Sequence, residues 1–228
     1  MSSSYLMVVP CIDREVTAGF VDGLKLPHEN VLFVNNGNPE VVPAGINQFF
    51  SGGNIGVAAS WNLGAKAVLG SGIDWLVIAS AAVRWGAPGG QDFIDGLEGC
   101  SIAVTSELGW HLLAIHHETL DAVGLFDENF FPGYFEETDW LYRMHLAGLP
   151  SPRENGRHWD HAHCDAEYGE SSHALNRVPR LAIETQMNAL GYYYQRKWAA
   201  KPGYEVYTTP FGLDNYPIWK WPAAENHN

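Results

Sequence analysis

Short apolar runs alternate with helix-like stretches along the first 80 residues of the chain. The runs are rich in Val, Leu and Ile, and they lie at 5–12, 31–36 and 74–80. Continuous apolar runs of this length are typical of strands that a parallel sheet buries on both faces. Between them, 14–24 and 54–69 have the spacing of helices. This order of strand, helix, strand, helix and strand predicts a doubly wound α/β fold.

The pattern becomes mixed in the second half of the chain. Strands are expected at 101–105 and 110–115, and a short helix at 117–123. A helix at 136–147 has its apolar residues on one face, and a longer helix is expected at 179–200. The second half therefore adds strands and helices in an order that does not repeat the first.

The C-terminal part from Pro202 is rich in proline and aromatic residues and is expected to pack as irregular coil. The sequence contains no internal repeat, no low-complexity segment and no linker that would divide it. A chain of 228 residues is long enough to bury a sizeable core. We therefore expect a single domain over residues 1–228.

The composition limits the classes of partner. Lys and Arg number 13 against 26 Asp and Glu, which gives a net charge of −13. This balance argues against non-specific binding to nucleic acid and to anionic membranes, both of which need clustered basic residues. With 9 Trp, 10 Tyr and 10 Phe, the chain also lacks the composition of a disordered protein. A small molecule that carries phosphate stays possible as a ligand, but a bound cation or a basic side chain must neutralise its negative charge.

Compartment is predicted from cysteine use and from hydropathy. Cys11, Cys100 and Cys164 are widely spaced, odd in number and outside any CxxC motif, which favours a reducing compartment. The N-terminus lacks the basic segment of a signal peptide. The longest apolar run, 75–83, is too short for a membrane span, which needs about 20 residues. We expect a soluble, cytoplasmic protein without a membrane span.

Polar or small residues lie at the ends of three of the predicted strands. They are Pro10, the pair Asn35 and Asn36, and the pair Ser80 and Ala81. Ligands of open α/β sheets bind outside the carboxyl ends of the strands, so these positions are candidate binding residues. The two Asn amides could pair with a base or a ribose, but Asn-Gly is also a common turn sequence.

Three carboxylates crowd the start of the helix at 136–147. Glu136, Glu137 and Asp139 follow an aromatic loop that contains glycine, FDENFFPGYF at 126–135. Acids in a first turn complement the helix dipole, which is one explanation. The other is that the loop shapes a pocket and that an acid at its edge acts as a general base.

A histidine-rich segment lies later in the chain. His158, His161 and His163 occur together with Asp160 and Asp165. An HxH sequence on a strand puts both imidazoles on one face, and His with Asp can bind a divalent metal. Surface histidines in a loop are the alternative.

In order, these segments resemble the GT-A glycosyltransferases, in particular family 2 enzymes of the rhamnosyl- and N-acetylglucosaminyl-transferase type. The resemblance covers about residues 5–175. VNNGNPE at 34–40 is similar to the family's V-D-N-G-S-x-D segment, and NIGVAASWNLGAKA at 54–67 is similar to N-x-G-x-a-x-x-x-N-x-G. The segment at 123–149 resembles G-x-F-D-E-x-F-F followed by y-x-E-D-x-D-l-x-x-R-x-x-x-x-G.

The resemblance implies a GT-A-like, Rossmann-related fold, with a mostly parallel sheet flanked by helices and a C-terminal helix and aromatic tail. It implies a nucleotide-binding half over about 1–100, an acceptor and catalytic half over 101–175, and the C-terminal helix and tail over 176–228. The implied activity is inverting transfer of a sugar from a nucleotide-diphosphate sugar, with a UDP-sugar favoured. The acceptor would be a hydroxyl group of a soluble glycan or a protein.

The resemblance also implies roles for the acids. Glu137 stands where the family has the Asp of its Glu-Asp pair and is the expected general base. Asp139 is the second candidate, and Glu136 would orient the acceptor or the base.

Further positions correspond to donor-binding residues of the family. Asn35 or Asn36 would contact the nucleobase, and Trp110 and His111 would line the sugar and acceptor pocket. Asn62 of the matched 54–67 motif joins Pro10, Ser80 and Ala81 as an expected binding residue.

The chain departs from the family at one motif. The family's Asp-x-Asp, which binds a divalent cation at the diphosphate, is replaced by Ala79, Ser80, Ala81 and Ala82, so the motif is degenerate here. Mn²⁺ or Mg²⁺ could instead be held by His161 or His163, Arg84 could neutralise the diphosphate, or the protein could bind without catalysing.

Two other functions stay open from the sequence. One is a non-catalytic module of the same fold that binds a nucleotide sugar or a glycan. The other is a metal-dependent hydrolase built on His161 and His163, which no nucleophile motif supports.

Overall fold

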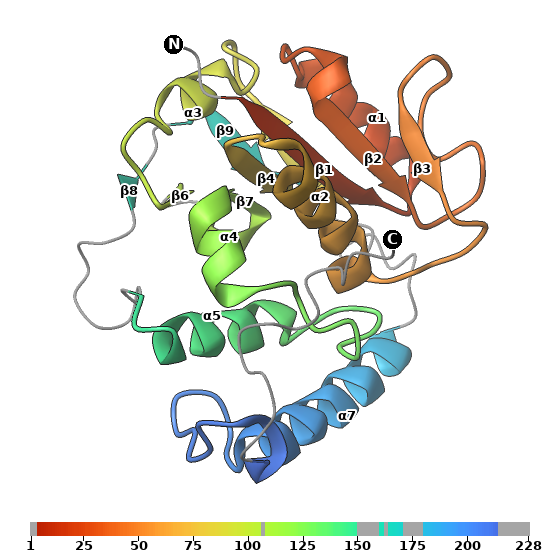
Figure 1. Ribbon diagram of the computed structural model, residues 1–228. Coiled ribbons are helices and arrows are strands. Elements are labelled where there is room, and N and C mark those ends of the chain that lie inside the picture. The colour runs from red at the N-terminus through yellow and green to blue at the C-terminus, as the bar shows by residue number, and fades with distance from the viewer. Residues whose placement is uncertain (1–3, 106–107, 150–159, 162–163, 171–179, 214–228) are drawn as a thin grey trace.

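The computed structural model describes residues 4–105, 108–149, 160–161, 164–170 and 180–213 (Figure 1). Within these residues, one seven-stranded sheet has the order β3-β2-β1-β4-β7-β6-β8, and β5 and β9 form a second, two-stranded sheet. The strands span β1 Tyr5–Cys11, β2 Val31–Asn35, β3 Gln48–Phe50, β4 Trp75–Ala79, β5 Val83–Trp85, β6 Ile102–Val104, β7 Leu112–His116, β8 Asp160–His161 and β9 Ala166–Tyr168.

The large sheet is parallel in its first half and mixed in its second. β1 pairs in parallel with β2 and β4, and β2 pairs in parallel with β3. β7 runs antiparallel to both of its neighbours, β4 and β6, and β8 pairs in parallel with β6. The carboxyl ends of β1, β2 and β4 therefore lie at one edge of the sheet, where ligands of such folds bind.

Helices cover both faces of this sheet (Figure 1). The helices of the described residues span α1 Arg14–Gly23, α2 Val57–Ser71, α3 Gln91–Asp95, α4 His117–Val123, α5 Glu136–Leu146 and α7 Arg180–Trp198. Alternate residues of β1 point to opposite faces, so Met7 and Val9 join the core under α1, while Val8 joins the core under α2 and α4. None of these helices has both the length and the apolar character of a membrane span.

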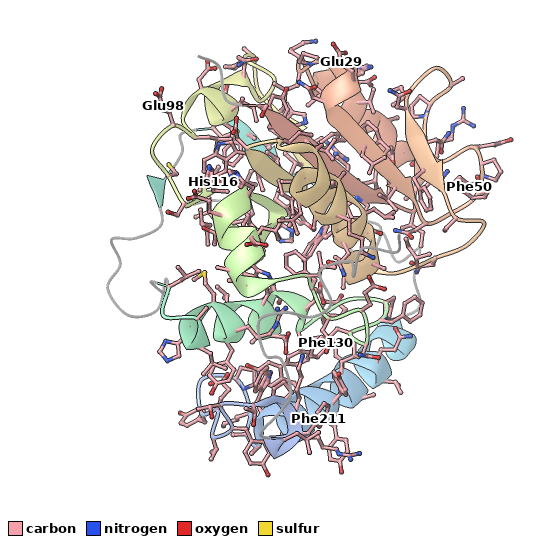
Figure 2. All side chains as sticks on the ribbon, viewed as in Figure 1. Glu29, Phe50, Glu98, His116, Phe130 and Phe211 are labelled. Atoms are coloured by element: carbon pink, nitrogen blue, oxygen red, sulfur yellow. The ribbon has the colours of Figure 1, made fainter. Side chains whose placement is uncertain are left out.

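The last helix lies against α5, at the end of the molecule away from the sheet (Figure 1). A third apolar cluster joins the two: Phe130, which precedes α5, packs with Leu190, Tyr194 and Trp198 of α7. Figure 2 shows Phe130 between the two helices. The C-terminal helix is therefore packed into the same unit as the segment that leads into α5.

The predicted fold class, an α/β fold with a mostly parallel sheet flanked by helices, is confirmed. The strand expected at 110–115 begins only at Leu112, because a 3-10 turn occupies Gly109–His111. The helix expected from residue 54 begins at Val57, after Gly56 with a φ of 85°. The short strands β3, β5 and β9 and the helix α3 were not predicted. The division into 1–100, 101–175 and 176–228 stays a prediction.

Candidate functional site

The segments that follow β1 and β2 are joined at the carboxyl edge of the sheet. The backbone N–H of Asn36 donates to the carbonyl of Cys11 at 2.7 Å, and the Asn36 side-chain oxygen accepts from the N–H of Ile55 at 2.9 Å. The loop after β2 is thereby tied to the end of β1 and to the segment that begins α2. Pro10 lies in β1 next to this junction, opposite Val34 in the register of the sheet.

The side-chain amides of Asn35 and Asn36, which were predicted to bind a base, form hydrogen bonds in and around the loop after β2. Both N–H groups of the Asn35 amide are used, one by the carbonyl of Asn38 at 3.0 Å and one by the Gln48 side chain at 2.8 Å. Asn36 donates to the hydroxyl of Ser60 at 3.0 Å, and both Asn side chains are buried. Asn35 is therefore used within the turn, whereas Asn36 joins the turn to the start of α2; whether either amide contacts a nucleobase stays a prediction.

The loop before α5 rests on the start of α2. The N–H of Val57 donates to the carbonyl of Pro132 at 2.8 Å. A Cβ at Gly56 would lie 2.9 Å from the Phe131 ring, so glycine allows this close approach. Tyr134 and Phe135 have φ values of 83° and 72°, a conformation that non-glycine residues rarely adopt. The first N–H group of α2 is thus capped by a carbonyl of the loop, and this contact places the loop before α5 against the start of α2.

Glu136 and Glu137 form the chemically distinctive part of the site. Only 5% of Glu136 is exposed, and its Oε2 atom has no hydrogen-bond partner among the described residues. Burial, and then the charge of Glu137, raise the pKa of Glu136 from about 4.5 to about 8. Burial also raises the pKa of Glu137, which is half-buried. Both carboxyl groups of the pair therefore hold a proton more tightly than an exposed glutamate does.

Tyr134 lies next to this pair, and Tyr168 and His111 follow beyond it. Tyr134 and Tyr168 are both exposed, and burial, followed by the charge of Glu136 and by Tyr168, raises the pKa of Tyr134. The ring of His111 lies 4.0 Å from that of Tyr168, and its pKa is lowered by burial, which favours the neutral imidazole. Exposed aromatic rings next to a carboxylate suit the apolar faces of a sugar.

The end of β4 approaches the same region. Ser80 donates its N–H to the carbonyl of His111 at 2.8 Å, and its hydroxyl accepts from the N–H of Ala82 at 3.2 Å. Ala81 is buried. Arg84 reaches back to this turn, since its Nη1 donates to the Ala81 carbonyl at 2.9 Å. The predicted residues His111, Ser80, Ala81 and Arg84 are therefore brought together.

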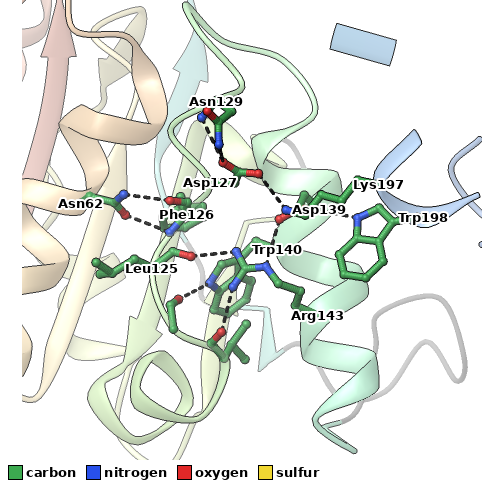
Figure 3. Close-up of polar contacts among 12 residues, drawn as sticks. Asn62, Leu125, Phe126, Asp127, Asn129, Asp139, Trp140, Arg143, Lys197 and Trp198 are labelled. Carbon is green, nitrogen blue, oxygen red and sulfur yellow. Dashed lines mark hydrogen bonds and ion pairs between the residues drawn. The ribbon is translucent and has the colours of Figure 1, made fainter. Parts of the chain in front are cut away.

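Asp139 lies in a different environment from the glutamates (Figure 3). It is completely buried and accepts from Arg143 at 2.9 Å, from the indole of Trp198 at 2.8 Å and from Lys197 at 2.6 Å. Lys197 also contacts Asp127 at 2.8 Å. Burial alone would raise the pKa of Asp127, but the charge of Lys197 keeps it below its ordinary value. Asp139 thus has cationic partners, no exposure and a structural role that the sequence did not indicate.

Of two other predicted binding residues, Asn62 is fully buried and Trp110 is partly buried against the core. The Asn62 amide exchanges two hydrogen bonds of 2.8 Å with the backbone N–H and carbonyl of Phe126 (Figure 3). Trp110 packs between Trp61 and Trp140, each with its ring centroid 6.4 Å away. The core-packing interpretation of Trp110 therefore accounts for its contacts, and Asn62 joins α2 to the segment before α5.

A divalent cation, which the resemblance implies, finds no matching donor set among the described residues. No group of three or more His, Cys, Asp or Glu side chains in this part of the chain could hold a metal ion. The end of β4 offers a serine hydroxyl and alanines, whereas Mg²⁺ and Mn²⁺ prefer carboxylate oxygens. The side chain of His161 and the whole of His163 lie outside the described residues.

The chain is similar to known proteins in structure but not in sequence. No protein-family model matches the chain, and no curated protein matches it in sequence. Among solved structures, a mannosyltransferase from Pyrobaculum calidifontis in complex with GDP-Man and Mn²⁺ is similar, with 13% identity and a TM-score of 0.48 over 66% of this chain. This chain spans about half of that protein, 54% of its length.

Two further solved structures are similar to this chain. TarS from S. aureus in complex with UDP has 12% identity and a TM-score of 0.47, with 86% of this chain and 72% of that chain covered. Galactosyltransferase 7 from Drosophila, with manganese, UDP-Gal and xylobiose, has 11% identity and a TM-score of 0.43, with 79% of each chain covered.

The sequence did not single out Tyr134 and Tyr168. Tyr134 lies in the loop that the sequence flagged as a pocket wall, so its place could have been inferred. Tyr168 comes to the site only because β9 pairs with β5, where Tyr168 lies opposite Val83. That pairing joins segments far apart in the chain, and neither segment has a clear strand pattern.

Proposed function

We propose that the protein is an inverting glycosyltransferase that uses a nucleotide-diphosphate sugar, with a UDP-sugar favoured. The observation that carries the proposal is the pair of carboxyl groups, Glu136 and Glu137, beside exposed aromatic rings at the carboxyl edge of the sheet. A base of raised pKa is what deprotonation of a sugar hydroxyl needs. The acceptor is a hydroxyl group of a soluble glycan or a protein.

In the proposed reaction, the acceptor oxygen attacks the anomeric carbon of the donor. The acceptor proton passes to a carboxylate oxygen of Glu137 as the new carbon–oxygen bond forms. The bond between the anomeric carbon and the diphosphate oxygen breaks, and its electron pair leaves with the nucleoside diphosphate. Attack opposite the leaving group inverts the anomeric centre.

The proposal assigns the base role to Glu137 among the three acids. Glu136 is only 5% exposed, so an acceptor hydroxyl has less access to it than to Glu137. Asp139 is completely buried and faces Arg143 and Lys197, so an acceptor hydroxyl cannot reach it. Glu137 is half-buried, which leaves it accessible while burial raises its pKa. Glu136 is assigned to orienting the acceptor or the base.

A screen of nucleotides tests the proposal. UDP, GDP and their sugars are added to the purified protein, each with EDTA, Mg²⁺ or Mn²⁺, and thermal unfolding is followed. We expect at least one diphosphate to raise the unfolding temperature, because a ligand that binds only the folded state stabilises it. The sugar of that nucleotide is then incubated with a panel of soluble glycans, and free nucleoside diphosphate and the anomeric configuration of the product are measured.

The same screen separates the second candidate, a non-catalytic module that binds a nucleotide sugar or glycan. The specific observation in its favour is the end of β4, where Ser80 and Ala81 stand and no carboxylate is present. Binding without any release of diphosphate, by hydrolysis or transfer, would favour the module. A protein that binds none of the nucleotides would contradict both candidates. The metal-hydrolase alternative needs His161 and His163, which lie outside the described side chains.

A further inference from the structure

Arg84 is fixed at the end of β4 by the protein backbone. It is the middle residue of the strand β5, and its Nη1 group donates to the carbonyls of Ala81 at 2.9 Å and Val83 at 3.0 Å. These two bonds hold the guanidinium beside the turn that follows the parallel strand. A cation at this position lies where the sheet presents its ligand-binding edge.

Two glycines from separate elements leave the space that the Arg84 side chain occupies. A Cβ added to Gly19 in α1 would lie 3.0 Å from Cζ and Nε of Arg84. A Cβ added to Gly169, just after β9, would lie 2.9 Å from its Cγ and 3.2 Å from its Nε. Any larger residue at these positions would displace the guanidinium, so three elements together define its place.

The charge of Arg84 has no carboxylate partner among the described residues. Arg143 is paired with Asp139 at 2.9 Å, and even the exposed Arg14 lies 3.4 Å from Glu40. Arg84 is half-buried and uses only Nη1 in its contacts, so Nε and Nη2 keep donors that no described residue accepts. Glu167 of β9 lies opposite Arg84 in the register of the small sheet but forms no ion pair with it. The charge of the half-buried Arg84 is therefore available to an anionic ligand.

We infer that Arg84 binds the diphosphate of the donor and neutralises its charge, so that binding and turnover need no divalent cation. This inference rests on the proposed function. The guanidinium presents a planar fork of donors that matches phosphate oxygens. The resemblance implies a divalent cation bound by carboxylates at the end of β4. This chain has no carboxylate there, so its residues do not fit that metal site.

The test compares nucleotide binding by the wild type, Arg84→Met and Arg84→Lys. UDP and GDP are titrated by calorimetry in excess EDTA and again with Mn²⁺, and uridine and guanosine serve as probes without phosphate. We expect the wild type to bind one of the diphosphates in EDTA. Arg84→Met should weaken that binding by roughly 10- to 100-fold, the effect of losing a hydrogen bond between charged groups. Arg84→Lys keeps the charge but not the fork and should lose less.

A matched control removes one positive charge elsewhere. Lys201→Met changes an exposed residue that contacts Tyr204 beyond α7, and it should leave binding of the diphosphate unchanged. Binding of the nucleoside without phosphate should be the same in all variants. If Arg84→Met does not fold, as thermal unfolding would show, the comparison of Arg84→Lys with the wild type carries the test.

The outcomes separate the inference from the proposed function. Binding that occurs only with Mn²⁺, or binding in EDTA that Arg84→Met leaves intact, would overturn the inference while the glycosyltransferase proposal stands. A protein that binds no nucleoside diphosphate with or without a cation would overturn both. Turnover of the nucleotide sugar in EDTA at the rate seen with Mn²⁺ would support the inference.

Discussion

Acids one helical turn apart in α5 have opposite electrostatic surroundings. Glu136 is buried with an oxygen that has no partner among the described residues, whereas Asp139 faces Arg143, Lys197 and Trp198. Complementing a helix dipole would explain acids in a first turn, but it does not explain a buried carboxyl oxygen, Oε2 of Glu136, that has no hydrogen-bond partner among the described residues. A buried polar group without a partner costs free energy, and such costs are concentrated at functional sites.

Glu136→Gln is expected to change how stability depends on pH. The folded-state pKa of about 8 lies above the ordinary 4.5, so the folded protein holds the proton more tightly than the unfolded chain. The stability of the wild type therefore falls as pH rises from about 4.5 to about 8. Glutamine mimics the protonated carboxyl, and the variant should be more stable at high pH by on the order of a few kcal/mol. Denaturant unfolding at acidic and alkaline pH measures this.

Glu98 provides the control for this comparison. It is exposed at the surface (Figure 2), and Glu98→Gln should follow the pH dependence of the wild type. If Glu136→Gln and the wild type lose stability in parallel between about pH 4.5 and 8, then Glu136 does not hold a proton in the folded state.

Asp139→Asn should act on stability and not selectively on turnover. The substitution removes the charge that faces two buried cations, and breaking a buried pair in this way costs about 3–5 kcal/mol. Denaturant unfolding measures the loss, and Asp121→Asn, at an exposed position of α4, is the matched control. An Asp139→Asn protein with the stability of the wild type but no transferase activity would return Asp139 to the list of candidate bases.

At the scale of elements, a buried cluster of two acids and two cations joins α5 to α7. Lys197 of α7 contacts Asp127 and Asp139, while Arg143 of α5 donates to the carbonyls of Val123 and Leu125. The charges balance, and the backbone before α5 is held at several points (Figure 3). The cluster thereby fixes the position from which Glu136 and Glu137 project.

Two glycines of α2 should respond in opposite ways to alanine. A Cβ at Gly64 would lie 2.0 Å from a methyl group of Val8 in β1, so Gly64→Ala should destabilise the fold by about 1–3 kcal/mol through overpacking. Gly70 has no atom within 4 Å of its Cβ position, so Gly70→Ala should stabilise the helix by about 0.5–1 kcal/mol. Equilibrium unfolding of both variants checks the difference. Equal effects would mean that α2 does not pack closely on β1.

The sequence predicted the long elements because their signals are local. β1, β2 and β4 are continuous apolar runs, and α5 has an apolar face. β3 has three exposed residues, so burial leaves no pattern in its sequence. β5 and β9 become strands through their pairing with each other, which no local signal records. The observed start of α2 differs from the predicted one because Gly56 has a positive φ, which the apolar pattern does not indicate.

The candidate site could be predicted only in part, for the same reason. The acids at 136–139 and the strand ends stood out because their residues are neighbours in sequence. The partners of Asp139 could not be predicted. Lys197 lies in the C-terminal helix, which the sequence predicted without indicating what that helix packs against. Chemistry alone therefore could not distinguish the buried Asp139 from the accessible Glu137.

In the whole molecule, the positions of the few Lys and Arg residues decide whether so acidic a chain can bind phosphate. The chain has 13 Lys and Arg against 26 acids. Lys197 and Arg143 are used inside the buried cluster, whereas Arg84 stands at the strand ends without an acidic partner among the described residues. A net negative charge is therefore compatible with a phosphate ligand when one cation is reserved for it.

The most direct test of the central claim is turnover by Glu137→Gln with the donor found in the nucleotide screen. The account predicts that the variant binds the nucleoside diphosphate as the wild type does, while its release of diphosphate in the presence of acceptor falls by about 100-fold or more. Glu98→Gln should keep full turnover. A Glu137→Gln protein that transfers sugar at the wild-type rate would contradict the account.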